Sequence, residues 1–228
     1  MTNIFIDIET LPTSREDIQA RTIEKVAPPG NYKKAETIAE WWKNEGEAAK
    51  QEAIAKTALD GTWGEILCIG FAVEDGPVEV IGRGQVSTER DCLDTWGLLT
   101  ESQLKRQTTT GILPPVQWIG HNLQDFDLRF LWQRTRVLNV RLPFVLPTGK
   151  PNYNSGQSVY DTMKEWAGYG NRIKQTDLEL ALGIERNDPL SGGSEVFKAY
   201  SEGRIEDIKE HCRQDVENLR AIYRRMTA

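Results

Sequence analysis

With 228 residues, of which 39% are hydrophobic and 27% charged, the chain has the size and composition of a soluble protein with one domain and an insertion. Its net charge of −6 argues against binding of nucleic acid through a broad basic surface, although it is compatible with a local basic patch and metal ions. The longest apolar run, residues 66–73, is too short to cross a bilayer. Three widely spaced cysteines argue against a disulfide framework or a zinc site, and with no signal-peptide pattern they favour a cytoplasmic location.

The first predicted strand, residues 3–10, carries two acids. Three isoleucines alternate with Phe5, Asp7 and Glu9, so the strand period of two puts both carboxylates on one face. Adjacent carboxylates repel, and a divalent cation bound by oxygen ligands is the usual way to hold them together. An edge strand with two solvated acids would show the same pattern. The choice between a metal site and an edge strand therefore depends on acids elsewhere in the chain.

Residues 11–64 are predicted to be a partly helical insertion, because they separate two strands that would otherwise be neighbours. Residues 13–35 are polar and irregular, whereas residues 36–59 have a helix-compatible content of Ala, Glu and Lys. Single-stranded nucleic acid needs aromatic and cationic contacts, which the insertion could offer as a lid through Trp41, Trp42, Lys33 and Lys34. Packing of one tryptophan onto the domain is the favoured alternative.

The remaining residues predict a mixed sheet. Residues 65–74 and 77–82 form two strands joined by an Asp-Gly hairpin turn, which makes the first three strands antiparallel. The later expected elements are a helix at 88–107, a strand at 116–120, a helix at 125–136, a loop at 141–158, a strand ending at 162, helices near 163–169 and 177–182, and helices at 195–202 and 205–226. This order is typical of an α/β domain flanked by helices, and we expect a single domain over residues 1–228.

Two further acids follow the strand at 116–120. Ligands collect at strand ends in open α/β sheets, and Asp127 lies there in the first turn of a predicted helix. Asp125 is the rival ligand, but it is better explained as a helix cap or a partner of the helix dipole. If both acids only decorate the start of the helix, neither is a ligand.

A third segment, on the last predicted helix, contains His211 and Asp215. Residues four apart lie on one helix face, so the imidazole and the carboxylate can point into the same cleft. A neutral imidazole with a pKa of about 6.5 is a good proton acceptor near neutral pH. A surface His–Asp pair is the alternative explanation.

These three segments, in this order, resemble the DEDD superfamily of 3′-5′ exonucleases, whose fold is ribonuclease H-like. The first motif matches residues 6–10, the second matches Asn122 with residues 126–131, and the third matches Asp215 within residues 211–216. With residues 192–202 and 218–223, the C-terminal part is similar to the proofreading exonuclease domain of family B DNA polymerases and its stand-alone relatives. The insertion lies outside the resemblance.

The third motif departs from the family pattern. The family has either a tyrosine four residues before the last aspartate or a histidine five residues before it, whereas His211 occupies the tyrosine spacing. One helix position is a rotation of about 100°, so His211 cannot simply be equated with the family histidine. We expect it to orient or deprotonate the attacking water.

The resemblance implies a metal-dependent exonuclease with two divalent ions, Mg²⁺ or Mn²⁺, about 3.5–4 Å apart. Asp7 would bridge both ions, Glu9 and Asp215 would complete the site nearest the attacking water, and Asp127 would hold the other ion. The catalytic set is these four acids with His211, and the products are nucleoside 5′-monophosphates.

The implied partners are the 3′ ends of single-stranded DNA, which is favoured, or of RNA, together with replication or repair proteins and no membrane. Thr10, Leu11, Asn122 and Phe126 are the implied substrate contacts, with Leu11 wedged against the terminal base. A catalytically weak or inactive nucleic-acid-binding module and an RNase H-type endonuclease are the alternatives. The presence of all four acids argues against the inactive module.

Overall fold

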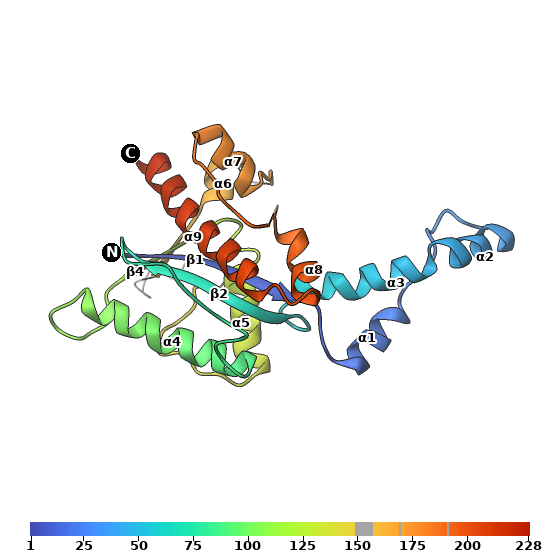
Figure 1. Ribbon diagram of the computed structural model, residues 1–228, viewed down its shortest axis with the longest axis horizontal. Helices are drawn as coiled ribbons and strands as arrows, with labels where there is room; N and C mark the ends of the chain where they lie inside the picture. Colours follow the sequence, from blue (N-terminus) through green and yellow to red (C-terminus); the bar gives the residue numbers. More distant parts are fainter. Residues whose placement is uncertain (149–156, 169, 191) are drawn as a thin grey trace.

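The computed structural model describes residues 1–148, 157–168, 170–190 and 192–228, and its centre is a five-stranded mixed sheet (Figure 1). The strand order is β3-β2-β1-β4-β5. Antiparallel pairs join β1 to β2 and β2 to β3, whereas β1 and β4, and β4 and β5, pair in parallel. The strands are β1 (Thr2–Leu11), β2 (Glu65–Val73), β3 (Glu79–Gly82), β4 (Val116–Gly120) and β5 (Gln157–Asp161). The expected α/β architecture, with three antiparallel strands before the βα units, is confirmed.

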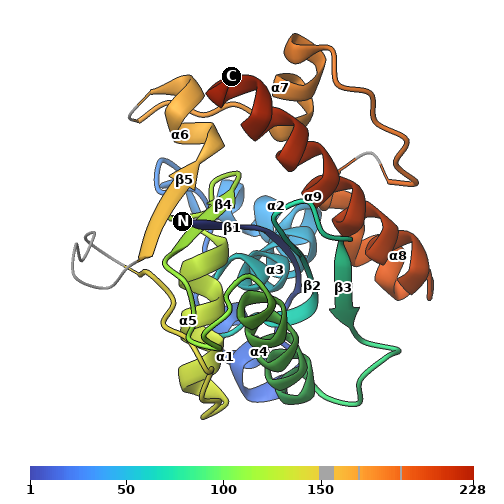
Figure 2. The same cartoon turned by 90° about the vertical axis from the view of Figure 1, so that its left-hand side faces the viewer.

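Helices cover both faces of this sheet, and each face has its own apolar core (Figure 2). One core contains the three isoleucines of β1 and packs against α4 (Glu89–Arg106) and α5 (Asp127–Val137). The other contains Phe5 and Leu11 and packs against α8 (Val196–Ser201) and α9 (Ile205–Thr227). Because side chains alternate along a strand, Asp7 and Glu9 belong to the α9 face.

The segment between β1 and β2 projects from the sheet as an arm (Figure 1). Its elements are α1 (Glu16–Ile23), α2 (Ala35–Asn44), α3 (Gly46–Ala55) and the 3-10 helix η1 (Lys56–Leu59). One expectation was wrong, because α1 occupies part of the stretch expected to be irregular. The expected helical stretch at 36–59 is confirmed, with a division at Glu45. In α2, Trp41 is buried and contacts Trp42 edge-on, with ring centroids 4.9 Å apart. Figure 1 shows α2 far from the sheet, and the packing of a tryptophan onto the domain stays a prediction.

The other helices follow the sequence signals closely. Thr88 caps α4 and forms a reciprocal capping box with Asp91, which satisfies backbone groups at the first turn. The remaining helices are α6 (Thr162–Ala167), α7 (Gln175–Leu182) and the 3-10 helix η2 (Gly193–Glu195). Gly183 ends α7 with φ +66°, a left-handed conformation that glycine adopts without strain. Residue 169 and residues 149–156 of the expected 141–158 loop lie outside the described residues. Among the described helices, none is both long and apolar enough to span a bilayer.

Candidate active site

Asp7 lies on β1 where α9 comes closest to the sheet. It pairs in register with Gly70 of β2, and the thiol of Cys212 on α9 donates to the Asp7 carbonyl at 3.7 Å. A Cβ on Gly70 would lie 2.7 Å from the Cys212 sulfur, so only glycine permits this approach of the helix. The Asp7 Oδ2 atom is buried and has no hydrogen-bond partner among the described residues. A buried carboxylate oxygen without a donor carries a large desolvation cost, which a bound cation would offset.

Asp127, the first residue of α5, is brought to the same part of β1. It is buried, and its Oδ1 accepts a hydrogen bond from the backbone N–H of Ile8 at 3.2 Å. Asp125, the rival acid, is instead exposed and pairs with Lys164 at 3.1 Å. Of the two acids after β4, Asp127 is therefore the one that faces the acids of β1.

His211 and Asp215, one turn apart on α9, face Glu9 across the helix–sheet interface. The Nε2 atom of His211 lies 3.4 Å from Glu9 Oε1 and 3.4 Å from Asp215 Oδ2. One ligand atom from each of the three residues lies within 4.8 Å of the others, and all three side chains are largely buried. This separation is small enough for one cation to contact all three atoms.

Residues outside the predicted motifs hold the α9 side chains in place. Arg186 makes a bidentate contact with Glu179, at 2.7 Å for both bonds, and also pairs with Asp188 and Asp215. Asp188 lies 2.5 Å from Nδ1 of His211. No motif or periodicity in the sequence marks these three supporting residues, because they act only through their position around α9.

Burial and mutual repulsion disfavour the charged forms of the clustered carboxylates. Burial raises the pKa of Asp7 well above its usual range, and the charges of Asp215, Glu9 and Asp127 raise it further. Burial likewise raises the pKa of Glu9 strongly, and it raises that of Asp127 to about 8. The pKa of Asp215 is raised by burial too, although His211 and Arg186 oppose the shift. Carboxylate oxygens with one imidazole nitrogen are a donor set that fits a divalent cation.

The expected substrate-contact residues occupy different environments. Thr10 donates from its hydroxyl to the carbonyl of Ala58 at 2.8 Å, and Leu11 is buried in the α9-side core at 3% exposure. Asn122 adopts φ +61°, and its buried Oδ1 atom has no hydrogen-bond partner within the described segments. Phe126 precedes α5 and contacts Phe130 in a tilted arrangement, with ring centroids 5.6 Å apart. Substrate contact by these residues stays a prediction, and for Leu11 it would need movement out of the core.

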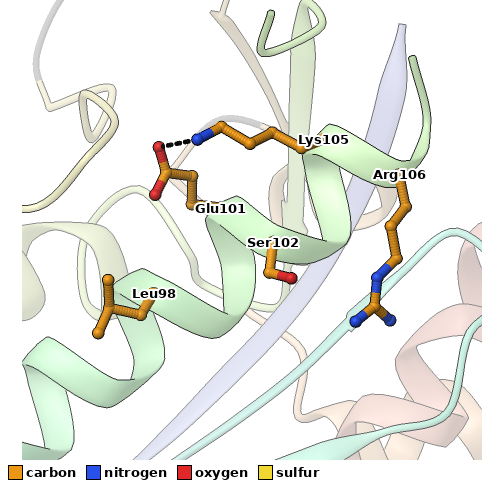
Figure 3. A pocket seen from close by; sticks show the side chains of 5 residues that line it. All are labelled: Leu98, Glu101, Ser102, Lys105 and Arg106. Carbon is orange, nitrogen blue, oxygen red and sulfur yellow. Dashed lines mark ion pairs between the residues drawn. The ribbon is translucent and has the colours of Figure 1, made fainter. Parts of the chain in front are cut away.

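A shallow hollow on the surface of α4 is separate from this cluster (Figure 3). Its lining side chains all come from one helix and include the ion pair between Glu101 and Lys105 at 2.8 Å. Because α4 packs on the sheet face opposite α9, the hollow contains none of the expected site residues.

Known proteins resemble this chain in family and in fold. Residues 54–227, more than half of the chain, match the family model of the RNase_H superfamily. The structure is similar to that of the family B DNA polymerase from the hyperthermophilic archaeon Pyrobaculum calidifontis, with a TM-score of 0.58 and 11% sequence identity. That match covers 100% of this chain and 24% of the polymerase. No curated protein matches the sequence. The expected resemblance is confirmed at the level of superfamily and fold, and the chain belongs to the RNase_H superfamily.

Proposed function

We propose that residues 1–228 form a single exonuclease domain, with residues 11–64 as its insertion, that degrades single-stranded nucleic acid from the 3′ end. DNA is the favoured substrate, nucleoside 5′-monophosphates are the products, and replication or repair proteins are the proposed partners. The observation that carries this proposal is the convergence of Asp7, Glu9, Asp127 and Asp215, from β1, α5 and α9. They lie around a buried carboxylate oxygen that has no donor in the described part of the chain. Membership of a superfamily of nucleases supports it.

In this proposal the four acids would hold two divalent ions, Mg²⁺ or Mn²⁺. When bound, such ions polarise the scissile phosphate, activate water and stabilise the leaving oxygen. The protein contributes a fixed geometry, since β1 places two of the acids and the Ile8 N–H holds the third. The carboxylates need no rearrangement when substrate arrives, and this preorganisation lowers the barrier.

Asn122 and Phe126 are the proposed contacts for the terminal nucleotide. The left-handed backbone of Asn122 turns the chain between β4 and α5, and Asp161 accepts its backbone N–H at 3.0 Å. Its buried amide oxygen, which has no hydrogen-bond partner among the residues that the structure describes, would accept a hydrogen bond from a base or a sugar once exposed to it. The Phe126 ring, half-buried, offers an apolar surface.

The test is cleavage of 5′-labelled single-stranded DNA and RNA of the same sequence, with Mg²⁺, Mn²⁺ or EDTA. Ladders that shorten from the 3′ end are expected with metal, and none with EDTA. Asp7→Ala removes the ladder, whereas Asp125→Ala, which changes an exposed acid near the second motif, leaves it unchanged. Binding without any cleavage would leave the inactive nucleic-acid-binding module standing, and internal cuts would favour the endonuclease.

A further inference from the structure

The imidazole of His211 has each nitrogen in a different environment. Its Nδ1 lies 2.5 Å from Asp188 Oδ2, and a carboxylate can only accept, so Nδ1 carries the hydrogen of that bond. In the neutral imidazole, Nε2 then presents a lone pair toward Glu9 Oε1 and Asp215 Oδ2. The separation of 3.4 Å to both oxygens is longer than a normal hydrogen bond. Three acceptor atoms therefore face one another across a gap.

Asp215 is fixed in the same way from its outer side. Its Oδ1 pairs with Arg186 and lies 3.3 Å from Nε2 of Gln175, while its Oδ2 points toward His211. The guanidinium of Arg186 also pairs with Asp188. Arg186 therefore connects Asp188, which orients the imidazole, to Asp215, which faces the imidazole. His211 and Asp215 thus each have one polar atom bonded to a supporting side chain and one polar atom directed into the space that they share with Glu9.

We propose that His211 is itself a ligand of the divalent ion that Glu9 and Asp215 bind, and that Asp188 and Arg186 are the positioning residues for this ligand set. The inference rests on the proposed function and deepens it. A histidine that ligates a metal through one nitrogen and donates from the other to a carboxylate is a stable and recurrent arrangement, because the second bond fixes the tautomer and the ring orientation.

This assignment changes the chemistry expected of His211. With Nδ1–H donated to Asp188 and the Nε2 lone pair given to a metal, no nitrogen remains to accept a proton from water. An imidazole ligand also favours transition ions over Mg²⁺, which prefers oxygen ligands alone. An ion held by Glu9, His211 and Asp215 would accordingly be a transition ion such as Mn²⁺.

The experiment is pulsed electron paramagnetic resonance of the full chain with Mn²⁺ alone. The chain has two histidines, so ¹⁵N-histidine labelling limits the source of a histidine–nitrogen coupling to His211 or His121. Both nitrogens of His121 are occupied, Nδ1 by Thr162 Oγ1 at 3.0 Å and Nε2 by the Ile173 carbonyl at 2.8 Å. We expect the coupling in wild type and in His121→Gln, and its loss in His211→Gln.

Calorimetric titrations of Mn²⁺ and Mg²⁺ give the second readout. Asp188→Ala should lose about 10–100-fold in Mn²⁺ affinity and weaken the nitrogen coupling. His211→Gln should lose at least as much in Mn²⁺ affinity and much less in Mg²⁺ affinity. Circular dichroism identifies variants that fail to fold. If His211→Gln is one of them, a coupling that is present in both wild type and His121→Gln still assigns the ligand to His211.

The inference is overturned if bound Mn²⁺ shows no histidine–nitrogen coupling in wild type, or if the coupling survives His211→Gln. Its failure differs from failure of the proposed function. Cleavage without the coupling would leave an exonuclease in which His211 is not a ligand. The coupling without cleavage of any strand would establish the ligand and remove the exonuclease.

Discussion

The backbone N–H of Ile8, which lies between Asp7 and Glu9 on β1, donates a hydrogen bond to Oδ1 of Asp127 at 3.2 Å. One side chain thus connects the start of α5 to the strand that carries the other acids. The Asp127 side chain therefore provides both a negative charge and a hydrogen-bond acceptor, and different substitutions remove one or both of them.

Asparagine and alanine at position 127 separate these properties. Asp127→Asn keeps the acceptor and loses the charge, so we expect an inactive protein that is at least as stable as wild type without metal. Asp127→Ala also leaves the buried Ile8 N–H without a partner, which should lower the free energy of unfolding by about 1–3 kcal/mol. Urea denaturation measures this difference, and equal stability of the two variants would contradict the structural role of the bond.

The stability of the metal-free protein should fall as the pH rises. The pKa of Asp127 is raised by burial to about 8, against about 4 in an unfolded chain, so between these values the folded state binds more protons. The contribution of Asp127 to the free energy of unfolding, on the order of a few kcal/mol, is therefore complete below pH ~4 and is lost as the pH rises through ~8. The pKa values of Asp7 and Glu9 are raised as well, so these residues add to the same pH dependence.

Thermal unfolding in EDTA at pH 5.5 and pH 8.5 tests this dependence. Asp127→Asn should reduce the difference in Tm between the two conditions, whereas Asp125→Asn, at an exposed acid, should not. An identical Tm difference in wild type and Asp127→Asn would show that Asp127 has an ordinary pKa in the folded state.

The buried ion pair between Arg134 and Glu89 should be essential for stability and irrelevant to chemistry. Both bonds of the bidentate contact measure 2.7 Å, and Glu89 also accepts the N–H of Ile66 while Arg134 donates to the Gly61 carbonyl. Arg134→Met leaves a buried carboxylate unpaired, which should cost about 3–5 kcal/mol.

The exposed pair of Lys105 and Glu101 is the matched control, since Lys105→Ala should cost less than about 1 kcal/mol. Cleavage per folded molecule should be the same as wild type in both variants. A loss of specific activity in Arg134→Met at temperatures where it is fully folded would show that the pair also positions the site.

Gly70→Ala should move α9 relative to β1. The added methyl would meet the Cys212 sulfur at 2.7 Å, so the helix that carries His211 and Asp215 must shift. We expect a loss of about 1–3 kcal/mol in stability and a fall of about tenfold or more in cleavage rate. Gly30→Ala, at a position where the new Cβ meets nothing within 4 Å, is the control. Wild-type rates in Gly70→Ala would mean that the site tolerates displacement of α9.

The sequence could identify the acids but not what holds them. Strand alternation put Asp7 and Glu9 on one face, and helix spacing put His211 and Asp215 together, because both rules describe local geometry. Arg186 and Asp188 lie in the irregular segment after Gly183, where no period relates a residue to its neighbours in space. The helix α1 was missed because only Ile18 among its residues is buried, which leaves almost no apolar pattern to detect.

The arm formed by α1, α2 and α3 leaves and rejoins the sheet at one point. At this neck, Thr10 donates to the Ala58 carbonyl at 2.8 Å and the N–H of Thr13 donates to Thr57 Oγ1 at 2.9 Å. The entropic cost of closing a loop changes only slowly with its length, so the stability of the sheet should depend little on how many residues lie beyond the neck. We therefore expect that a short linker in place of residues 16–55 keeps β1 and its acids in place. Any change in the length or kind of strand degraded would then be an effect of the removed helices.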